Sequence, residues 1–174
     1  MPALSLRPNS ASSIQVPGSD PWRASPDDPA LSVMTDFRER ASVTVSETDS
    51  IDAALEHMKH TGVRCAFAVD SDRSFVVGMI TAYDISSEKP MRLMQALNTK
   101  RSDMLVRDLM QRMSDWRVLH IEDLERSTVA AIGRLFDESS LTHIPVMEKN
   151  IQGESRLRGL LSSAKVKRLL ARHT

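Results

Sequence analysis

The sequence lacks several features that define whole classes of protein. Its 174 residues contain one cysteine, Cys65, so no disulfide can form within the chain, which fits a reducing compartment. No stretch approaches the ~18 uninterrupted apolar residues of a membrane-spanning helix, and no apolar segment follows a basic start as in an export signal. An excess of one charge is also lacking, because 23 Lys and Arg balance 23 Asp and Glu. We therefore expect a cytoplasmic, non-membrane protein for which nucleic acid is not an expected partner.

Motifs for catalysis and for metal binding are lacking as well. The sequence has no Ser-His-Asp constellation, no Walker loop and no Rossmann fingerprint. His57 and His60 are three residues apart, but no Asp, Glu or Cys at a metal-site spacing accompanies them, so they indicate a solvated helix face. We expect no enzymatic activity, no required cofactor and no metal site.

The first 30 residues form a segment rich in proline and serine, with few apolar residues at any regular spacing. Six of the eight prolines lie in it. Such a segment has no core of its own, so residues 1–30 are either a flexible tail or an arm that docks on another surface. In the second case Trp22 is the expected anchor, because an indole buries a large apolar area.

From residue 31 onward the sequence repeats itself with only small changes in spacing. Each copy predicts a strand, a helix, two strands and a second helix. The first helix of each copy carries an apolar stripe that begins at Ile51 or Val129, and Asp49 or Ser50 is placed to cap the earlier one. The predicted strands are residues 43–45, 64–69 and 75–80, repeated at 119–121, 142–147 and 157–161, and the last helices begin at Thr81 and Ser162.

A unit of about 55 residues is too small to bury its own sheet well. We therefore expect an α/β fold, more specifically α+β, in which two β-α-β-β-α repeats pack sheet to sheet with pseudo-two-fold symmetry. The predicted organisation is an N-terminal arm at 1–30, a first repeat at 31–88, a linker at 89–105 and a second repeat at 106–174.

The repeats resemble a tandem pair of CBS domains, the Bateman module, over nearly all of residues 31–170. The resemblance rests on VMTDF, GVRCAFAVD and GMITAYDI in the first copy, and on LTHIPVME and GLLSSAKV in the second. It implies a non-enzymatic regulatory protein that binds AMP, ADP, ATP or S-adenosylmethionine between the repeats and signals by a change of shape. It also implies a homodimer.

The family's adenosine-site signature is a glycine, two apolar residues, Ser or Thr, two further residues and an Asp. Gly78, Thr81 and Asp84 match it position for position. The second copy keeps Gly159 and Ser162 but has Lys165 where the acid belongs, so an ordinary ribose site is not expected there.

Thr81 and Asp84 lie where a strand is predicted to run into a helix. A helix N-terminus attracts phosphate, and a carboxylate can accept hydrogen bonds from both hydroxyls of a ribose. The base then needs an apolar slot, for which we expect Val45, Ala66 and Phe67. The same T-x-x-D pattern also predicts a helix capping box, and a ligand could take over an acid that caps the empty protein.

Several other residues are candidates for ligand contact or for structural roles. Cys65 is expected in the shared core as a small apolar residue. Arg64 and His143 stand where the family places phosphate-facing side chains, although a strand-end residue facing solvent is the structural alternative. The further candidates of the second copy are Ile144, Pro145, Ser162 and Lys165.

Two other functions are compatible with the sequence. The pair could be a ligand-free dimerisation scaffold whose cleft is filled by its own side chains. Lys165 and the bulky Phe67 favour this interpretation. Alternatively, the basic C-terminal segment KVKRLLARHT could dock the protein on an enzyme, a transporter or a nucleic acid. A closing helix with a solvated cationic end is the structural explanation for the same residues.

Overall fold

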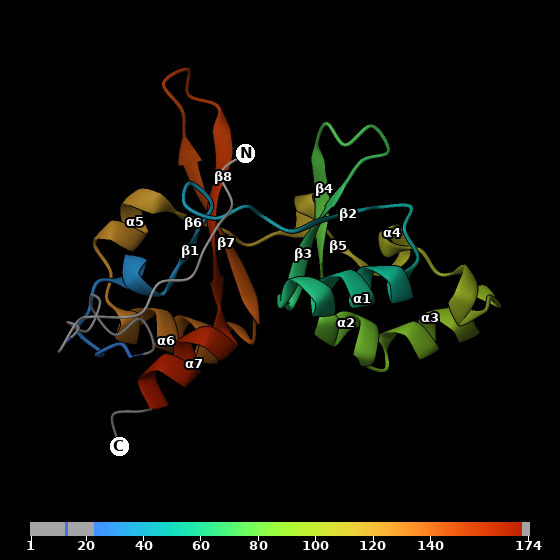
Figure 1. Ribbon diagram of the computed structural model, residues 1–174, viewed down its shortest axis with the longest axis horizontal. Coiled ribbons are helices and arrows are strands. Elements are labelled where there is room, and N and C mark those ends of the chain that lie inside the picture. Colours follow the sequence, from blue (N-terminus) through green and yellow to red (C-terminus); the bar gives the residue numbers. More distant parts are fainter. Residues whose placement is uncertain (1–12, 14–22, 172–174) are drawn as a thin grey trace.

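The computed structural model describes residue 13 and residues 23–171 as two sheets with helices around them. Figure 1 shows the sheets side by side, with their hairpins at one end of the molecule and most helices at the other. The strands are β1 (Thr35–Asp36), β2 (Thr44–Ser46), β3 (Cys65–Val69), β4 (Val76–Thr81), β5 (Gln111–Arg112), β6 (Leu119–His120), β7 (His143–Lys149) and β8 (Ser155–Ser162). The α-helices are α1 (Ile51–Thr61), α2 (Ala82–Ser86), α3 (Lys89–Leu97), α4 (Val106–Leu109), α5 (Ile121–Glu125), α6 (Val129–Ser139) and α7 (Ser163–Leu170).

The two sheets have the same topology, which confirms the predicted fold class. One has the order β2-β3-β4-β5 and the other β6-β7-β8-β1. In each, the first pair of strands is parallel and the next two pairs are antiparallel. Even the links to the last helices correspond, since Ala82 N–H donates to Arg64 O and Ser163 N–H donates to Thr142 O, both at 2.9 Å. This correspondence is the expected pseudo-two-fold symmetry.

Each sheet receives its last strand from the other half of the chain. β1 lies at the start of the first repeat but pairs with β8, and β5 lies at the start of the second repeat but pairs with β4. The signature glycines lie at these junctions. A Cβ on Gly78 would lie 2.7 Å from the Gln111 carbonyl oxygen, and one on Gly159 would lie 2.6 Å from that of Thr35. Glycine is thus required so that the exchanged strand can approach.

The helices α1 and α6 are the amphipathic helices that the periodicity predicts. Ser50 caps α1, its hydroxyl accepting from the N–H of Ala53 at 3.1 Å, and Thr128 caps α6 in the same way. Their apolar stripes face their own sheets and form the two main cores. Their fully or almost fully buried members are Ile51, Ala54 and Met58 in α1, and Val129, Ile132 and Phe136 in α6.

A third, smaller core joins the two sheets. Phe67 lies at its centre, with ring centroids 5.6 Å from Phe37 and 5.8 Å from Trp116. Cys65 is buried in the same cluster, as predicted, and burial raises the pKa of its thiol to about 12. This thiol is therefore protonated and unreactive near neutral pH.

The chain departs from the predicted elements at several places, among them α4 and the short strands β1 and β5, which the sequence pattern does not predict. Ile121, predicted to end a strand, begins helix α5 instead. The predicted linker 89–105 contains α3 and a 3-10 turn, η2 (Arg101–Asp103), and Met104 after them is buried in the first core. Residues 23–33 pack on the second core through Ala24, Ala30 and Val33, with a 3-10 turn, η1 (Ala30–Val33). The arm anchor proposed at Trp22 lies outside the described residues.

None of the helices in the described part of the chain is long and apolar enough to cross a membrane.

Candidate functional site

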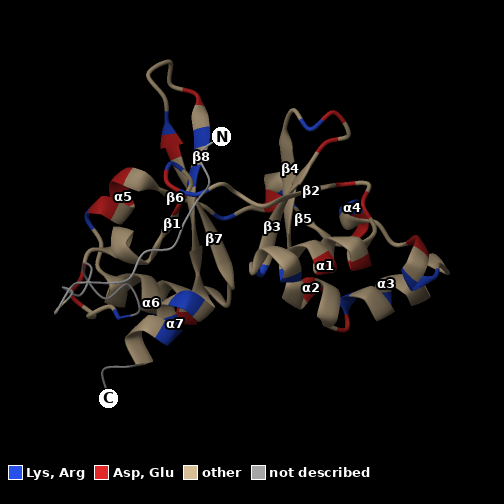
Figure 2. Ribbon diagram, viewed as in Figure 1, with Lys and Arg blue, Asp and Glu red and all other residues tan. Residues whose placement is uncertain are grey.

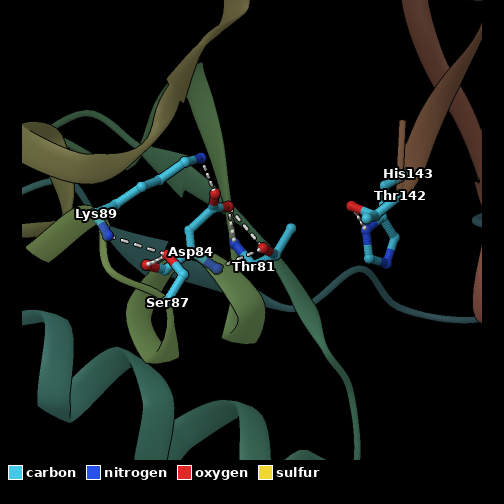
Figure 3. Close-up of polar contacts among 6 residues, drawn as sticks. All are labelled: Thr81, Asp84, Ser87, Lys89, Thr142 and His143. Atoms are coloured by element: carbon cyan, nitrogen blue, oxygen red, sulfur yellow. Dashed lines mark hydrogen bonds and ion pairs between the residues drawn. The ribbon is translucent and has the colours of Figure 1, made fainter. Parts of the chain in front are cut away.

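The N-terminus of α2 borders a cavity between the two halves of the molecule. Its volume is about 390 Å³. Signature residues Thr81 and Asp84 form one side, and residues just before and in β7 form another (Figure 3). We call this space the first cavity; its lining is Met79, Thr81, Tyr83, Asp84, Lys89, Leu109, Met110, Gln111, Ser140, Leu141, Thr142 and His143.

Thr81 and Asp84 form the predicted capping box. The Thr81 hydroxyl accepts from the N–H of Asp84 at 3.0 Å. Asp84 Oδ2 in turn accepts from the Thr81 N–H at 3.1 Å and from its hydroxyl at 2.6 Å. The capping interpretation is therefore confirmed, and it holds the Asp84 carboxylate rigidly at the mouth of the first cavity.

The second oxygen of Asp84 is paired with a cation that the sequence did not single out. Lys89, at the start of α3, places its ammonium group against Asp84 Oδ1. The Asp84 side chain is 13% exposed and that of Lys89 is 58% exposed. Most of the Lys89 side chain is therefore accessible to solvent, whereas most of the Asp84 side chain is covered.

His143 faces this pair from β7, across the gap seen in Figure 3. Burial lowers its pKa to about 4, and the negative charge of Asp84 only partly opposes this shift. Its Nδ1 lies 3.1 Å from the hydroxyl of Thr142. The imidazole is neutral at pH 7, so in the absence of a ligand His143 supplies no positive charge for a phosphate.

Two of the residues expected to contact the base lie outside the first cavity. Val45 and Ala66 are buried in the first main core, and neither lines the first cavity, which corrects their expected position. Both residues belong to strands of the first sheet, but their side chains face the helices, since successive residues of a strand point to opposite faces. The apolar side chains of the first cavity include Met79, Leu109 and Met110, which the sequence reasoning missed. No local signal marks Leu109 and Met110, because they reach the cavity only through the exchange of β5.

A second cavity of about 370 Å³ lies at the N-terminus of α7, in the corresponding position. It receives Arg64, Phe67, Ser162 and Lys165 of the predicted site residues, and His143 lines both cavities. Its full lining is Thr35, Phe37, Ala41, Val43, Gly62, Val63, Arg64, Cys65, Phe67, His143, Leu160, Ser162, Ala164, Lys165 and Arg168.

The remaining predicted residues contact neither space. Ile144 is part of the second main core and Pro145 is a buried residue of β7, and neither lines a cavity. His57 and His60 are exposed on α1, and the described residues contain no cluster of three or more His, Cys, Asp or Glu that could hold a metal ion.

Comparison with known families identifies one match. Residues 15–89 match the CBS domain family. No protein with a curated description matches the chain.

Solved structures with the same fold cover most of the chain. The CBS-pair protein CBSX2 of Arabidopsis thaliana, in complex with AMP, is 23% identical over 81% of this chain and 94% of its own, with a TM-score of 0.54. The CBS domain pair of protein MJ0100, in complex with 5′-methylthioadenosine and S-adenosyl-L-methionine, is 19% identical over 86% and 100%, also with a TM-score of 0.54. An uncharacterised conserved protein of Pyrococcus horikoshii is 18% identical over 87% and 96%, with a TM-score of 0.57. At these identities the likeness establishes the fold.

Proposed function

The chain carries a CBS domain and folds as a CBS-domain pair, and on that basis we propose that it is a non-enzymatic regulatory protein that binds an adenosine-containing ligand in the first cavity. The observation that carries the proposal is the position of Asp84. Its carboxylate lies in the lining of a cavity between the repeats, beside a helix N-terminus and the exposed ammonium group of Lys89. Proteins of this fold bind AMP, 5′-methylthioadenosine and S-adenosylmethionine, which supports the same class of ligand here.

The contacts of Asp84 suggest how a ribose would be accommodated. A vicinal diol would donate to Oδ1 in place of Lys89, while Oδ2 keeps its bonds to Thr81. The displaced ammonium group would then be available to a phosphate at the mouth. The apolar side chains of Met79 and Met110 would contact the base.

Signalling would follow from the composition of the cavity lining. Met79 and Asp84 come from the first repeat, and Thr142 and His143 come from the second. A ligand that touches both repeats can favour one relative arrangement, whereas equal affinity for two arrangements would shift nothing.

Titration calorimetry with AMP, ADP, ATP, S-adenosylmethionine and adenosine tests the proposal. We expect at least one ligand to bind, and Asp84→Ala to weaken it about 10- to 150-fold, because a charge-assisted hydrogen bond is lost. Asp52→Ala is the matched control, since Asp52 is an exposed acid on α1 that pairs with Arg101 at 2.8 Å, outside the cavity. Equal affinities of wild type and Asp84→Ala would remove Asp84 from the site.

A second candidate function is a ligand-free scaffold. It is favoured by one observation, that both oxygens of Asp84 are already satisfied by Thr81 and Lys89. In that case none of the five ligands would raise the melting temperature, whereas at a concentration of 100 Kd a true ligand adds about 2.7 kcal/mol to the stability.

We also propose that the protein is a homodimer. Tyr83, Met91 and Leu97 expose large apolar surfaces on α2 and α3, at 60–68% of their areas, and a second copy could cover them. Light scattering coupled to size-exclusion chromatography would measure the mass directly. Docking on another protein through the basic C-terminal helix stays a prediction.

A further inference from the structure

A third cavity, larger than the other two, lies between the hairpins β3–β4 and β7–β8, at the hairpin end of the molecule (Figure 1). Its volume is about 1240 Å³, and we call it the hairpin groove. Met110 lines both this groove and the first cavity, and no residue of the groove lines the second cavity. The hairpin groove is therefore a different site from the two cavities at the N-termini of α2 and α7.

Both walls of the hairpin groove contain a strand with a free edge. β5 pairs only with Gly78 and Met79 of β4, so Val76 and Val77 have no neighbouring strand on that side. In the same way β1 pairs only with Gly159 and Leu160 of β8, which leaves residues 155–157 without a second neighbour. A free strand edge can accept a strand of another chain through main-chain hydrogen bonds.

The hairpin groove is lined largely by apolar side chains. Phe75, directly before β4, is 72% exposed, and Met113 and Trp116 contribute from the segment after β5. Ile151, in the turn between β7 and β8, is fully exposed. Exposed apolar side chains beside free strand edges indicate a surface that pairs with another polypeptide.

The hairpin groove also carries charges of both signs. Glu47, Arg112 and Arg156 all line it, and within the described residues no ion pair involves their side chains. Figure 2 shows acidic and basic positions on both hairpins. A surface with both signs complements itself when a two-fold axis places its acids against its bases, whereas a partner of a single charge would be repelled by part of it. The charges therefore favour a second copy of this chain as the occupant.

We propose that the hairpin groove binds the β7–β8 hairpin of a second copy of the chain. β8 of each copy adds to the free edge of β4 in the other, and Ile151 enters the apolar groove. Arg156 then contacts Glu47 of the partner subunit. Since each copy offers one groove and one hairpin, a two-fold axis makes the two contacts equivalent. This interface uses neither the first cavity nor the exposed side chains of α2 and α3 that we propose for the homodimer.

Light scattering coupled to size-exclusion chromatography of the full chain tests the proposal. We expect wild type to have at least twice the mass of Phe75→Asp and of Ile151→Asp, because each variant would bury a carboxylate without a partner. Both side chains are exposed, so these variants keep the fold. The matched control is Val118→Asp, which adds the same charge at an exposed apolar residue outside the groove and should keep the mass of wild type. Equal masses of wild type and both hairpin variants would overturn the proposal.

Met91→Asp separates the hairpin interface from the proposed homodimer face on α2 and α3. Met91 is exposed on α3 and does not line the hairpin groove. Whatever Met91→Asp does to the mass, the addition of Phe75→Asp to this variant should lower it, because the two faces are separate. If the double variant and Met91→Asp had the same mass, the hairpin groove would not be an interface.

Exchange of charges tests the contact between Arg156 and Glu47 of the partner subunit. Arg156→Glu alone places acids against acids at both equivalent contacts, and Glu47→Arg alone places bases against bases, so each variant should dissociate at this interface. An equimolar mixture of the two variants restores opposite charges at both contacts and should regain the mass of wild type. A mixture that keeps the lower mass would overturn the second copy as the occupant and would indicate a segment of a different protein.

Discussion

Asp84 has one role in the ligand-free protein and another, which competes with the first, in the proposed complex. Asp84 caps α2 and holds Lys89 in the ligand-free protein, and it is the residue that we propose for ribose binding. Lys89 therefore opposes binding of the sugar and favours binding of a phosphate. The two effects can be separated by ligands with and without phosphate.

Lys89→Met should shift the ligand preference in opposite directions. Affinity for adenosine should rise about two- to fivefold, since the exposed ion pair that the sugar must displace is worth little. Affinity for AMP should fall relative to adenosine, because the cation for its phosphate is lost. Calorimetry with both ligands measures the ratio, and Arg92→Met, which breaks an exposed pair with Glu88 at 2.9 Å on the same helix, is the control. If Lys89→Met changed the affinities for adenosine and AMP by the same factor, Lys89 would not bind the phosphate.

His143 makes the stability of the protein depend on pH. Its pKa is about 4 in the folded protein against 6.5 in the unfolded chain, because burial disfavours the charged imidazolium. Between these values the unfolded chain binds a proton that the folded chain does not. The contribution of neutral His143 is thus complete above pH 6.5 and is lost as the pH falls to 4, by up to about 3 kcal/mol.

Urea unfolding at several pH values would measure this dependence. His143→Asn should be less dependent on pH than wild type between pH 4 and 6.5, since the titrating group is gone. An NMR titration of the folded protein should place the imidazole midpoint near 4. A midpoint near 6.5 would show that the ring is solvated.

Among the elements, the strands that carry the signature glycines are the most constrained. Gly78 and Gly159 are required by the close approach of the exchanged strands β5 and β1, whereas Gly133 lies in the interior of α6. A Cβ on Gly133 would lie 3.6 Å from Leu170 Cδ1, an ordinary contact. Replacement of glycine by alanine should therefore lower the free energy of unfolding at Gly78 and Gly159 and raise it at Gly133.

Gly159→Ala should lower the free energy of unfolding by about 1–3 kcal/mol, because the new methyl group collides with the backbone of β1. Gly133→Ala should raise it by about 0.5–1 kcal/mol through helix propensity. Urea denaturation of both variants measures the difference. Equal effects would show that β1 does not pack closely on β8.

The periodic elements were predictable and the irregular ones were not. Ser50 and the stripe from Ile51 to Met58 specify α1 locally, since cap and apolar period agree. Helix α5 is only five residues long, too short for a periodic signal, and follows β6 without an intervening loop. Helix α3 was assigned to the linker. Its Leu93 and Met94 pack against the first main core, whereas Met91 and Leu97 are exposed.

The whole molecule is joined by the exchange of segments between its halves. Ala30, Val33 and Met34 complete the second main core, and Met104, Val106 and Leu109 complete the first. Ion pairs strengthen one junction, where Arg158 of β8 contacts Asp36 of β1 at 2.8 Å. Neither half can therefore keep its core without the other.

Thermal unfolding should accordingly be a single transition. Val33→Ala and Val106→Ala remove fully buried methyl groups from different cores, and each should destabilise the protein by about 2 kcal/mol. Calorimetry should show one peak in both variants, shifted to lower temperature, with equal calorimetric and van't Hoff enthalpies. Two resolved peaks, with each variant moving only one, would contradict the coupling.

The sequence by itself determined the two-repeat fold, the main helices and strands, and the capping pair Thr81 and Asp84, because these depend on local periodicity and on spacing within one segment. The sequence also shows that the second copy has Lys165 at the position of Asp84. Only the tertiary structure decided which residues meet at each cavity. Leu109 and Met110 line the same cavity as Asp84, and Val45 faces the first main core instead, because strand exchange and sheet facing are set by contacts between segments far apart in the chain.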